Sequence, residues 1–97
     1  MVKLKWTEQA VGDLKNIFDY ISNDSIYYAK RQISKIKLSV DPLKIMPKLG
    51  RVVPEFNKDN LREIILERYR IVYLIVSPDR VNIITVHHTS KDRIEVS

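Results

Sequence analysis

Cysteine is absent from this sequence of 97 residues, and there are only two glycines. The lack of cysteine excludes disulfides, thiolate metal sites and cysteine nucleophiles, and it fits a reducing cytoplasm. With so little glycine, flexible linkers and low-complexity segments are not expected. The longest apolar run, Ile71–Val76, is far too short to cross a bilayer, and the N-terminus has no apolar signal segment. We therefore expect a single cytoplasmic domain over residues 1–97 that does not contact a membrane.

The charge of the chain is basic. Seventeen Lys and Arg residues outnumber 12 Asp and Glu residues, which gives a formal net charge of +5. Small basic domains often bind nucleic acid or an acidic protein segment, although such a charge can also serve solubility alone. Composition leaves these alternatives open.

The N-terminal half has the hydrophobic spacing of a strand followed by two helices. Alternating apolar and basic residues predict a strand over Val2–Trp6, and Thr7 is a suitable N-cap for the first helix. That helix should end at the polar run 22–25. An apolar stripe over residues 26–43 predicts a second, basic helix that ends or kinks at Asp41-Pro42. The short connection predicts an antiparallel helical hairpin.

The C-terminal half is predicted to be mainly β-structure. Pro47–Asn60 is rich in loop-forming residues. Three segments rich in β-branched and aromatic residues follow, Leu61–Leu66, Tyr69–Val76 and Val81–His88, with short turns between them. The expected fold class is therefore α+β, in the order β-α-α-β-β-β, with the helical hairpin packed on a mainly antiparallel four-stranded sheet.

Short motifs occur along the chain in a particular order. They are Trp6-Thr7, Asp13-Leu14, Asp19-Tyr20-Ile21, Gly50-Arg51, Pro54-Glu55, Leu61-Arg62-Glu63-Ile64, Tyr69-Arg70-Ile71-Val72-Tyr73 and Val86-His87-His88. In this order and spacing, and over nearly the whole chain, the sequence resembles the RelE/ParE superfamily of toxins from type II toxin–antitoxin systems.

The resemblance implies a toxin that is neutralised by a small antitoxin with an acidic C-terminal segment. RelE-like members cut mRNA in the ribosomal A site, whereas ParE-like members poison DNA gyrase, so the shared scaffold does not name the target. The leading prediction is a ribosome-dependent mRNA endonuclease that needs no metal and no cofactor. The alternatives are a gyrase inhibitor without nuclease activity and an inactive relative that only binds an antitoxin.

Metal-free cleavage of RNA by its own 2′-hydroxyl needs a base, an acid and cations at the phosphate. Arg62 and Arg70 are candidates for the phosphate, because a planar guanidinium can hold two oxygens. His88 is a candidate acid or base near neutral pH, and Glu55 is a candidate base or a group that orients one. In apolar strands, however, arginines are often surface residues or ion-pair partners, and Glu55 is equally consistent with a solvated loop carboxylate.

Further cations and a second histidine are candidates for substrate binding. These are Lys48 and Arg51 in the loop and His87 in the last strand. Neighbouring residues of a strand point to opposite faces, so His87 and His88 should not share one face or bind one metal.

The C-terminal tail departs from the family pattern. Many RelE-like nucleases end in a tyrosine or in an arginine-rich segment, but this tail has no tyrosine, which leaves Lys91 and Arg93 as its substrate-binding candidates. The long helical hairpin resembles ParE-like members instead.

The strand register decides which candidates meet. If Glu67-Arg68 is a two-residue turn, Arg62 lies opposite Tyr73, and a longer turn would change every partner. The sequence alone does not establish that Arg62, Arg70 and His88 converge.

Overall fold

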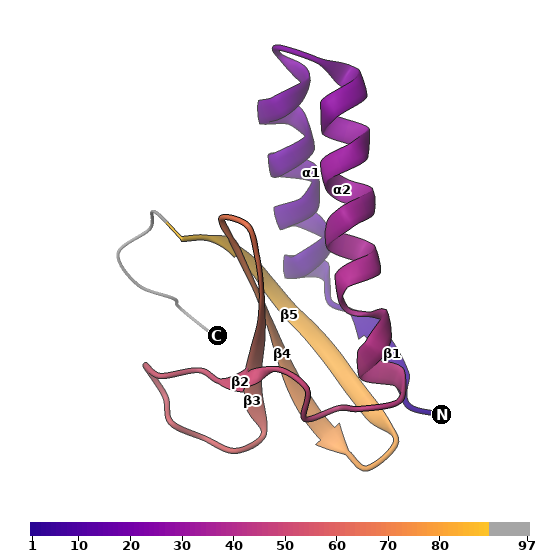
Figure 1. Ribbon diagram of the computed structural model, residues 1–97, viewed down its shortest axis with the longest axis vertical. Coiled ribbons are helices and arrows are strands. Elements are labelled where there is room, and N and C mark those ends of the chain that lie inside the picture. Colours follow the sequence, from indigo (N-terminus) through magenta and orange to yellow (C-terminus); the bar gives the residue numbers. More distant parts are fainter. Residues whose placement is uncertain (90–97) are drawn as a thin grey trace.

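Two helices cover one face of a five-stranded sheet in the computed structural model, which describes residues 1–89 (Figure 1). The elements are β1 (Lys3–Trp6), α1 (Glu8–Ser22), α2 (Ile26–Ser39), the short 3₁₀ helix η1 (Asp41–Lys44), β2 (Arg51–Val52), β3 (Leu61–Leu66), β4 (Tyr69–Ser77) and β5 (Arg80–His88). The strand order is β1-β5-β4-β3-β2, in which only β1 and β5 are parallel. The predicted α+β class is confirmed, and the predicted elements occur in the predicted order with one additional strand, β2. Within residues 1–89, no helix is long and apolar enough to span a membrane.

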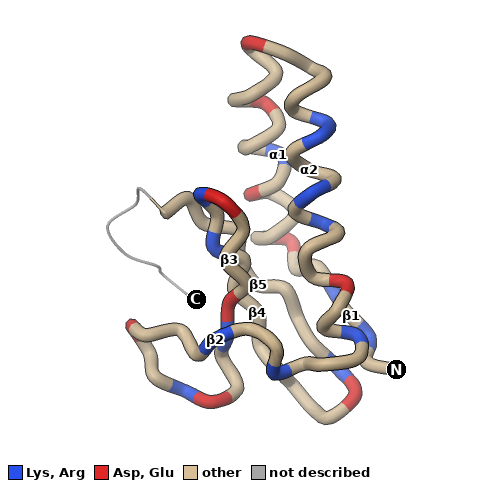
Figure 2. The backbone as a smooth tube through the Cα atoms, in the orientation of Figure 1, with Lys and Arg blue, Asp and Glu red and all other residues tan. Residues whose placement is uncertain are grey.

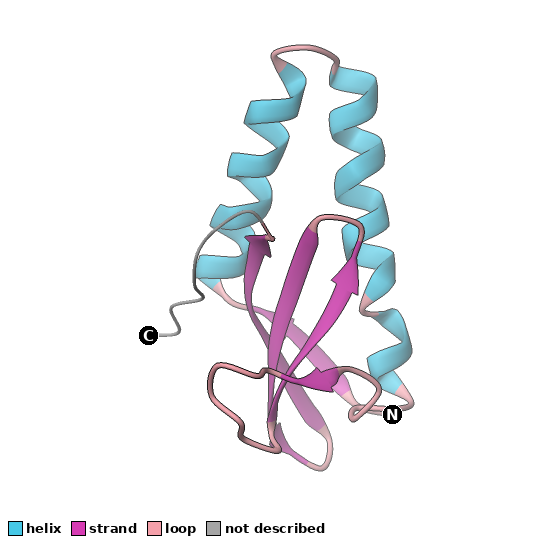
Figure 3. Cartoon of the chain, turned by 60° about the vertical axis from the view of Figure 1, so that its left-hand side comes forward, coloured by secondary structure: helices cyan, strands magenta, loops and turns pink. Residues whose placement is uncertain are grey.

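Side-chain caps set the start of both helices. The Thr7 hydroxyl accepts a hydrogen bond from the Ala10 N–H and donates one to the Ile83 carbonyl, so the cap also joins α1 to β5. The Ser25 hydroxyl caps α2 in the same way. The second helix ends at Ser39, just before the Asp41-Pro42 step, as predicted. The hairpin extends well beyond the sheet (Figure 3).

The expected four-stranded sheet has a fifth strand, because part of the segment predicted to be a loop pairs with β3. Arg51 lies opposite Glu63 in this pairing. Gly50 makes the close approach possible, because a Cβ atom there would lie 2.5 Å from the Glu63 carbonyl oxygen. The Gly50 N–H also donates to the buried Tyr73 hydroxyl, which in turn donates to the Pro47 carbonyl. These anchors hold a two-residue strand that hydrophobic periodicity could not reveal.

The register of β3 and β4 is the predicted one. Glu67 has a positive φ of 55° in the tight turn, and Arg62 lies opposite Tyr73. Side chains alternate across the sheet, so one set faces the helices and the other faces away. We call these the inner face and the outer face.

The two faces carry cores of different size. The inner core joins helix and strand residues, namely Ala10, Leu14, Ile36, Val40, Leu43, Ile71, Tyr73, Val81, Ile83 and Val86. The outer core consists of Val53, Leu61 and Val72. It lies beside the segment that connects β2 to β3, so the rest of the outer face is free to carry polar groups.

Candidate functional site

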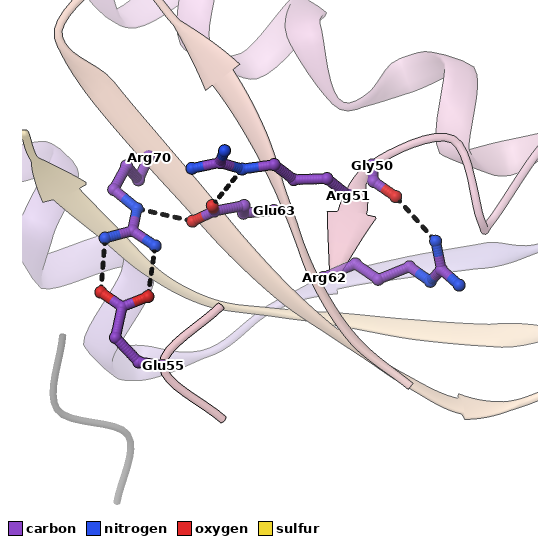
Figure 4. Close-up of polar contacts among 6 residues, drawn as sticks. All are labelled: Gly50, Arg51, Glu55, Arg62, Glu63 and Arg70. Carbon is purple, nitrogen blue, oxygen red and sulfur yellow. Dashed lines mark hydrogen bonds and ion pairs between the residues drawn. The ribbon is translucent and has the colours of Figure 1, made fainter. Parts of the chain in front are cut away.

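The outer face carries a chain of four alternating charges (Figure 4). The Arg51 Nε donates to Glu63 Oε2 at 2.7 Å, and the Arg70 Nε donates to Glu63 Oε1 at 2.6 Å. The other two nitrogens of Arg70 donate to both oxygens of Glu55, at 2.7 and 2.8 Å. Two guanidinium groups and two carboxylates thus form one continuous network.

Strand pairing brings these residues together. Glu63 on β3 lies opposite Arg51 on β2, and Arg70 on β4 lies opposite Ile65, two residues further along β3. Residues two apart on a strand share a face, so Glu63 and Arg70 are diagonal neighbours on the outer face. Glu55 reaches Arg70 from the connection between β2 and β3.

The network fixes the protonation of its members. Hydrogen bonds from Arg70 lower the pKa of Glu55 from 4.5 to about 2. The same bonds, together with those to Glu63, raise the pKa of Arg70 above its ordinary value. The side chain of Glu63 is 0% exposed and carries two charge-assisted hydrogen bonds. Glu55 and Arg70 therefore form a charged pair near neutral pH.

Arg62 does not belong to this network. It pairs with Tyr73, a residue of the inner core, and Figure 4 shows its side chain directed away from Arg70. Its guanidinium donates to the Gly50 carbonyl at 2.9 Å and to the carbonyl and carboxylate of Asp59, each at 2.8 Å. Arg62 therefore holds the two ends of the loop between Lys48 and Asp59. The sheet places Arg62 and Arg70 on opposite faces.

The two histidines also face opposite ways, as predicted from their adjacency. His88 lies opposite Tyr69, and the two rings meet edge to face with centroids 5.4 Å apart, on the inner face. His87 lies opposite Arg70, which places it on the outer face. Its Nε2 atom is buried and has no hydrogen-bond partner within residues 1–89. Only His87 shares a face with the charged network.

Lys48, a further substrate-binding candidate, lies outside the network. Lys48 is exposed and pairs with Asp59 at 3.2 Å, next to Arg62. Lys91 and Arg93 lie outside the described residues. Over the range that the structure describes, no group of three or more His, Asp or Glu side chains could hold a metal ion.

Glu63 is the member of the network that sequence reasoning missed as a site residue. It lies in an apolar strand between Arg62 and Ile64 and is almost completely buried. The sequence contains part of the information needed to find Glu63, because strand alternation places Glu63 on the same face as Leu61 and Ile65. An ionised side chain on the apolar face of a strand needs a partner, and the register supplies Arg51 and Arg70.

The fold and the site together define a small basic α+β domain with a helical hairpin on one face of the sheet and a charged network on the other. A family model described as "ParE toxin of type II toxin-antitoxin system, parDE" matches residues 4–93, so the chain belongs to this toxin family. A toxin of this family has an antitoxin as its partner.

Two similar proteins agree with this assignment. The chain is 29% identical to "Toxin RelE2" of Caulobacter vibrioides over 91 residues, which are 94% of this chain and 99% of that protein. A solved structure, "Chromosomal ParDE TA system from P. aeruginosa", has the same fold with a TM-score of 0.74 and 24% identity, over 91% of this chain and 96% of that one. The RelE/ParE resemblance seen in the sequence is confirmed.

Proposed function

We propose that this toxin arrests translation as a ribosome-dependent mRNA endonuclease, with its active site on the outer face of the sheet. One observation carries the proposal. Four side chains that suit RNA cleavage, Glu55, Arg70, Arg51 and His87, come from separate segments and lie on one face. They include the base, the acid and the cations that metal-free cleavage requires.

Each residue has a role in the proposed reaction. Arg70 and Arg51 bind the scissile phosphate. Arg51 is 58% exposed, and within residues 1–89 its Nε is the nitrogen that bonds Glu63, which leaves the terminal nitrogens to face the substrate. Glu55 takes the proton of the 2′-hydroxyl, and the 2′-oxygen attacks the phosphorus atom. His87 gives a proton to the departing 5′ oxygen, which leaves a 2′,3′-cyclic phosphate. In this proposal Arg62 and His88 support the structure and take no part in the chemistry.

The test is primer extension on a reporter mRNA in a purified translation system, with wild type and Arg70→Lys. Lysine keeps the charge but cannot bind two oxygens, so we expect cleavage to fall at least about tenfold. Lys15→Gln, on the hairpin far from the outer face, is the matched control. Cuts that appear only during translation support the proposal, and an intact mRNA with a folded toxin that still arrests growth contradicts it.

A second candidate function, inhibition of DNA gyrase by binding, is favoured by the tip of the hairpin. Tyr20, Tyr27 and Tyr28 are 78%, 66% and 62% exposed there. Exposed tyrosines are common at the centre of protein interfaces. A supercoiling assay with wild type and with Tyr27→Ser/Tyr28→Ser tests this candidate. Full supercoiling with excess wild-type toxin excludes it, and absence of any growth arrest on induction would favour an inactive relative that only binds its antitoxin.

A further inference from the structure

The phosphate-binding group of the proposed active site is already occupied in the free toxin. Arg70 donates to both oxygens of Glu55 in the parallel, two-bond arrangement by which arginine also binds phosphate. Its Nε is bonded to Glu63, and its side chain is only 14% exposed. The two-bond fork of Arg70 can therefore hold an RNA phosphate only if one carboxylate leaves.

The two carboxylates are held very differently. Glu63 belongs to a central part of β3, is 0% exposed and accepts from both arginines. Glu55 lies in the connection between β2 and β3, is 34% exposed and contacts only Arg70 among the charged groups of the network. Removing a buried partner of a charge costs far more than exchanging an exposed one. Glu55 is therefore the exchangeable carboxylate.

The charge of the site without Glu55 matches one phosphodiester. Arg51 and Arg70 contribute two positive charges and Glu63 one negative charge, which leaves one net positive charge. A phosphodiester carries one negative charge, and its two free oxygens can replace those of Glu55 on the Arg70 fork.

On the basis of the proposed function, we propose that the Arg70 guanidinium is a phosphodiester-binding site for RNA, that Glu55 fills it in the free toxin, and that Glu63 is the positioning residue that holds Arg51 and Arg70 in place. RNA binding then displaces Glu55 from Arg70. Once displaced, Glu55 loses the contact that lowers its pKa and becomes a better proton acceptor. The same exchange thus binds the substrate and prepares the base.

Binding of a fluorescein-labelled, fully 2′-O-methylated RNA hexamer, followed by anisotropy, tests the exchange without cleavage. Glu55→Gln removes the charge that competes for Arg70, so we expect affinity to rise about tenfold over wild type. Glu67→Gln is the matched control, because it also removes one exposed carboxylate that pairs with a cation, Lys35. Equal affinities for Glu55→Gln and Glu67→Gln would overturn the proposal.

The double variant Glu55→Gln/Arg70→Gln locates the source of the tighter binding. We expect its affinity to fall below that of the Glu67→Gln control, because the control keeps Arg70 and the double variant does not. We also expect the salt dependence of binding to be shallower in the double variant than in Glu55→Gln by about 0.7, because one phosphate contact is lost. Tighter binding that survives the loss of Arg70 would show that the phosphate binds elsewhere.

The role of Glu63 is tested in the Glu55→Gln background. Glu63→Gln removes a negative charge, so electrostatics alone predicts tighter RNA binding, whereas a positioning role predicts weaker binding and a shallower salt dependence than in Glu55→Gln alone. Circular dichroism establishes the folded fraction, and Glu63→Asp, which keeps the charge, should recover part of the affinity. Tighter binding by Glu63→Gln would overturn the positioning role.

The two proposals fail in different ways. The methylated probe has no free 2′-hydroxyl, so its binding does not depend on catalysis. Tighter binding by Glu55→Gln without any mRNA cuts by wild type would refute the endonuclease and leave the exchange standing. Translation-dependent cuts with unchanged binding by Glu55→Gln would refute the exchange alone.

Discussion

Each face of the sheet carries an arginine in a polar network, but the two arginines have different kinds of partner. On the inner face, Arg62 binds the backbone of Gly50 and the carbonyl and carboxylate of Asp59, and it ties a loop to the sheet. On the outer face, the partners of Arg70 within residues 1–89 are carboxylates, and we propose that one of them, Glu55, is exchangeable. Both side chains are 14% exposed, so exposure does not separate them. What separates them is the partner, since backbone carbonyls cannot move away without unfolding the loop whereas a loop carboxylate can.

The distribution of charge sharpens this contrast (Figure 2). Lysines and arginines on α2 lie along a helix, and apart from Lys35 no ion pair of α2 cations is found within residues 1–89. On the outer face every charge of the network has a partner. The cations of α2 are therefore mostly unpaired within residues 1–89, whereas the charges of the network neutralise one another.

The largest effect on stability is expected from Gly50→Ala, because Gly50 lies against the backbone of Glu63 and is hydrogen-bonded to Tyr73. Its Cβ would lie 2.5 Å from the Glu63 carbonyl oxygen and 2.7 Å from the Tyr73 hydroxyl. We expect the free energy of unfolding to fall by about 3 kcal/mol, the upper range for overpacking. Gly12→Ala is the matched control, because that position has open space in a helix, where alanine should add about 0.5–1 kcal/mol. Urea unfolding measures both, and equal stability of the two variants would contradict the anchor.

The histidines test the faces separately. His87→Ala should lower mRNA cleavage by about 100-fold, the ordinary contribution of a general acid. His88→Ala should leave cleavage within about twofold and remove the edge-to-face contact with Tyr69, which is worth about 1 kcal/mol. Single-turnover cleavage and thermal unfolding separate these effects. The reverse pattern would place the chemistry on the inner face.

Arg62→Ala should act on stability rather than on chemistry. It leaves the carbonyls of Gly50 and Asp59 without their donor, and we expect a loss of about 2 kcal/mol in the free energy of unfolding. Cleavage measured well below the unfolding transition should stay close to wild type. If this variant folds normally but does not cut RNA, Arg62 is part of the active site.

A smaller effect is expected from pH. The pKa of Glu55 lies at about 2 in the folded protein, below its ordinary value of 4.5, so its ion pair stabilises the fold above pH 4.5 and this contribution is lost as the pH falls toward about 2. As the pH falls across this window, the urea midpoint of Glu55→Gln should therefore decrease less than the urea midpoint of the wild type. Asp59→Asn is the comparison on the other side of the loop, because Lys48 and Arg62 lower the pKa of Asp59. A wild-type slope in Glu55→Gln would argue against the ion pair in solution.

Much of the fold could be predicted because local signals agree with the final structure. Thr7 caps α1, the Asp41-Pro42 step ends α2, and the two-residue turn at Glu67 gives the predicted register. The fifth strand could not be predicted, because β2 has only two residues and depends on Gly50 and Tyr73, which lie 23 positions apart. Long-range contacts of this kind leave no local pattern.

The candidate site was predictable only in its chemistry. The sequence points to arginines, histidines and Glu55, and it predicts that His87 and His88 lie on opposite faces, but it does not establish which histidine shares a face with Arg70. Register and alternation decide that Arg70 and His87 lie together and that Arg62 and His88 do not. Glu63 was missed as a site residue because a carboxylate next to an arginine in a strand looks like an ordinary surface pair.

The pairing of β1 with β5 has a consequence for how the toxin is made. Lys3 lies beside Arg80, so the first strand to be synthesised is completed by the last. Closing a loop of this length is slow, and it is impossible before β5 has been synthesised. We therefore expect the nascent chain to remain incompletely folded while its mRNA is being translated. The strand β1 gains its neighbour in the sheet only once the residues of β5 have been joined.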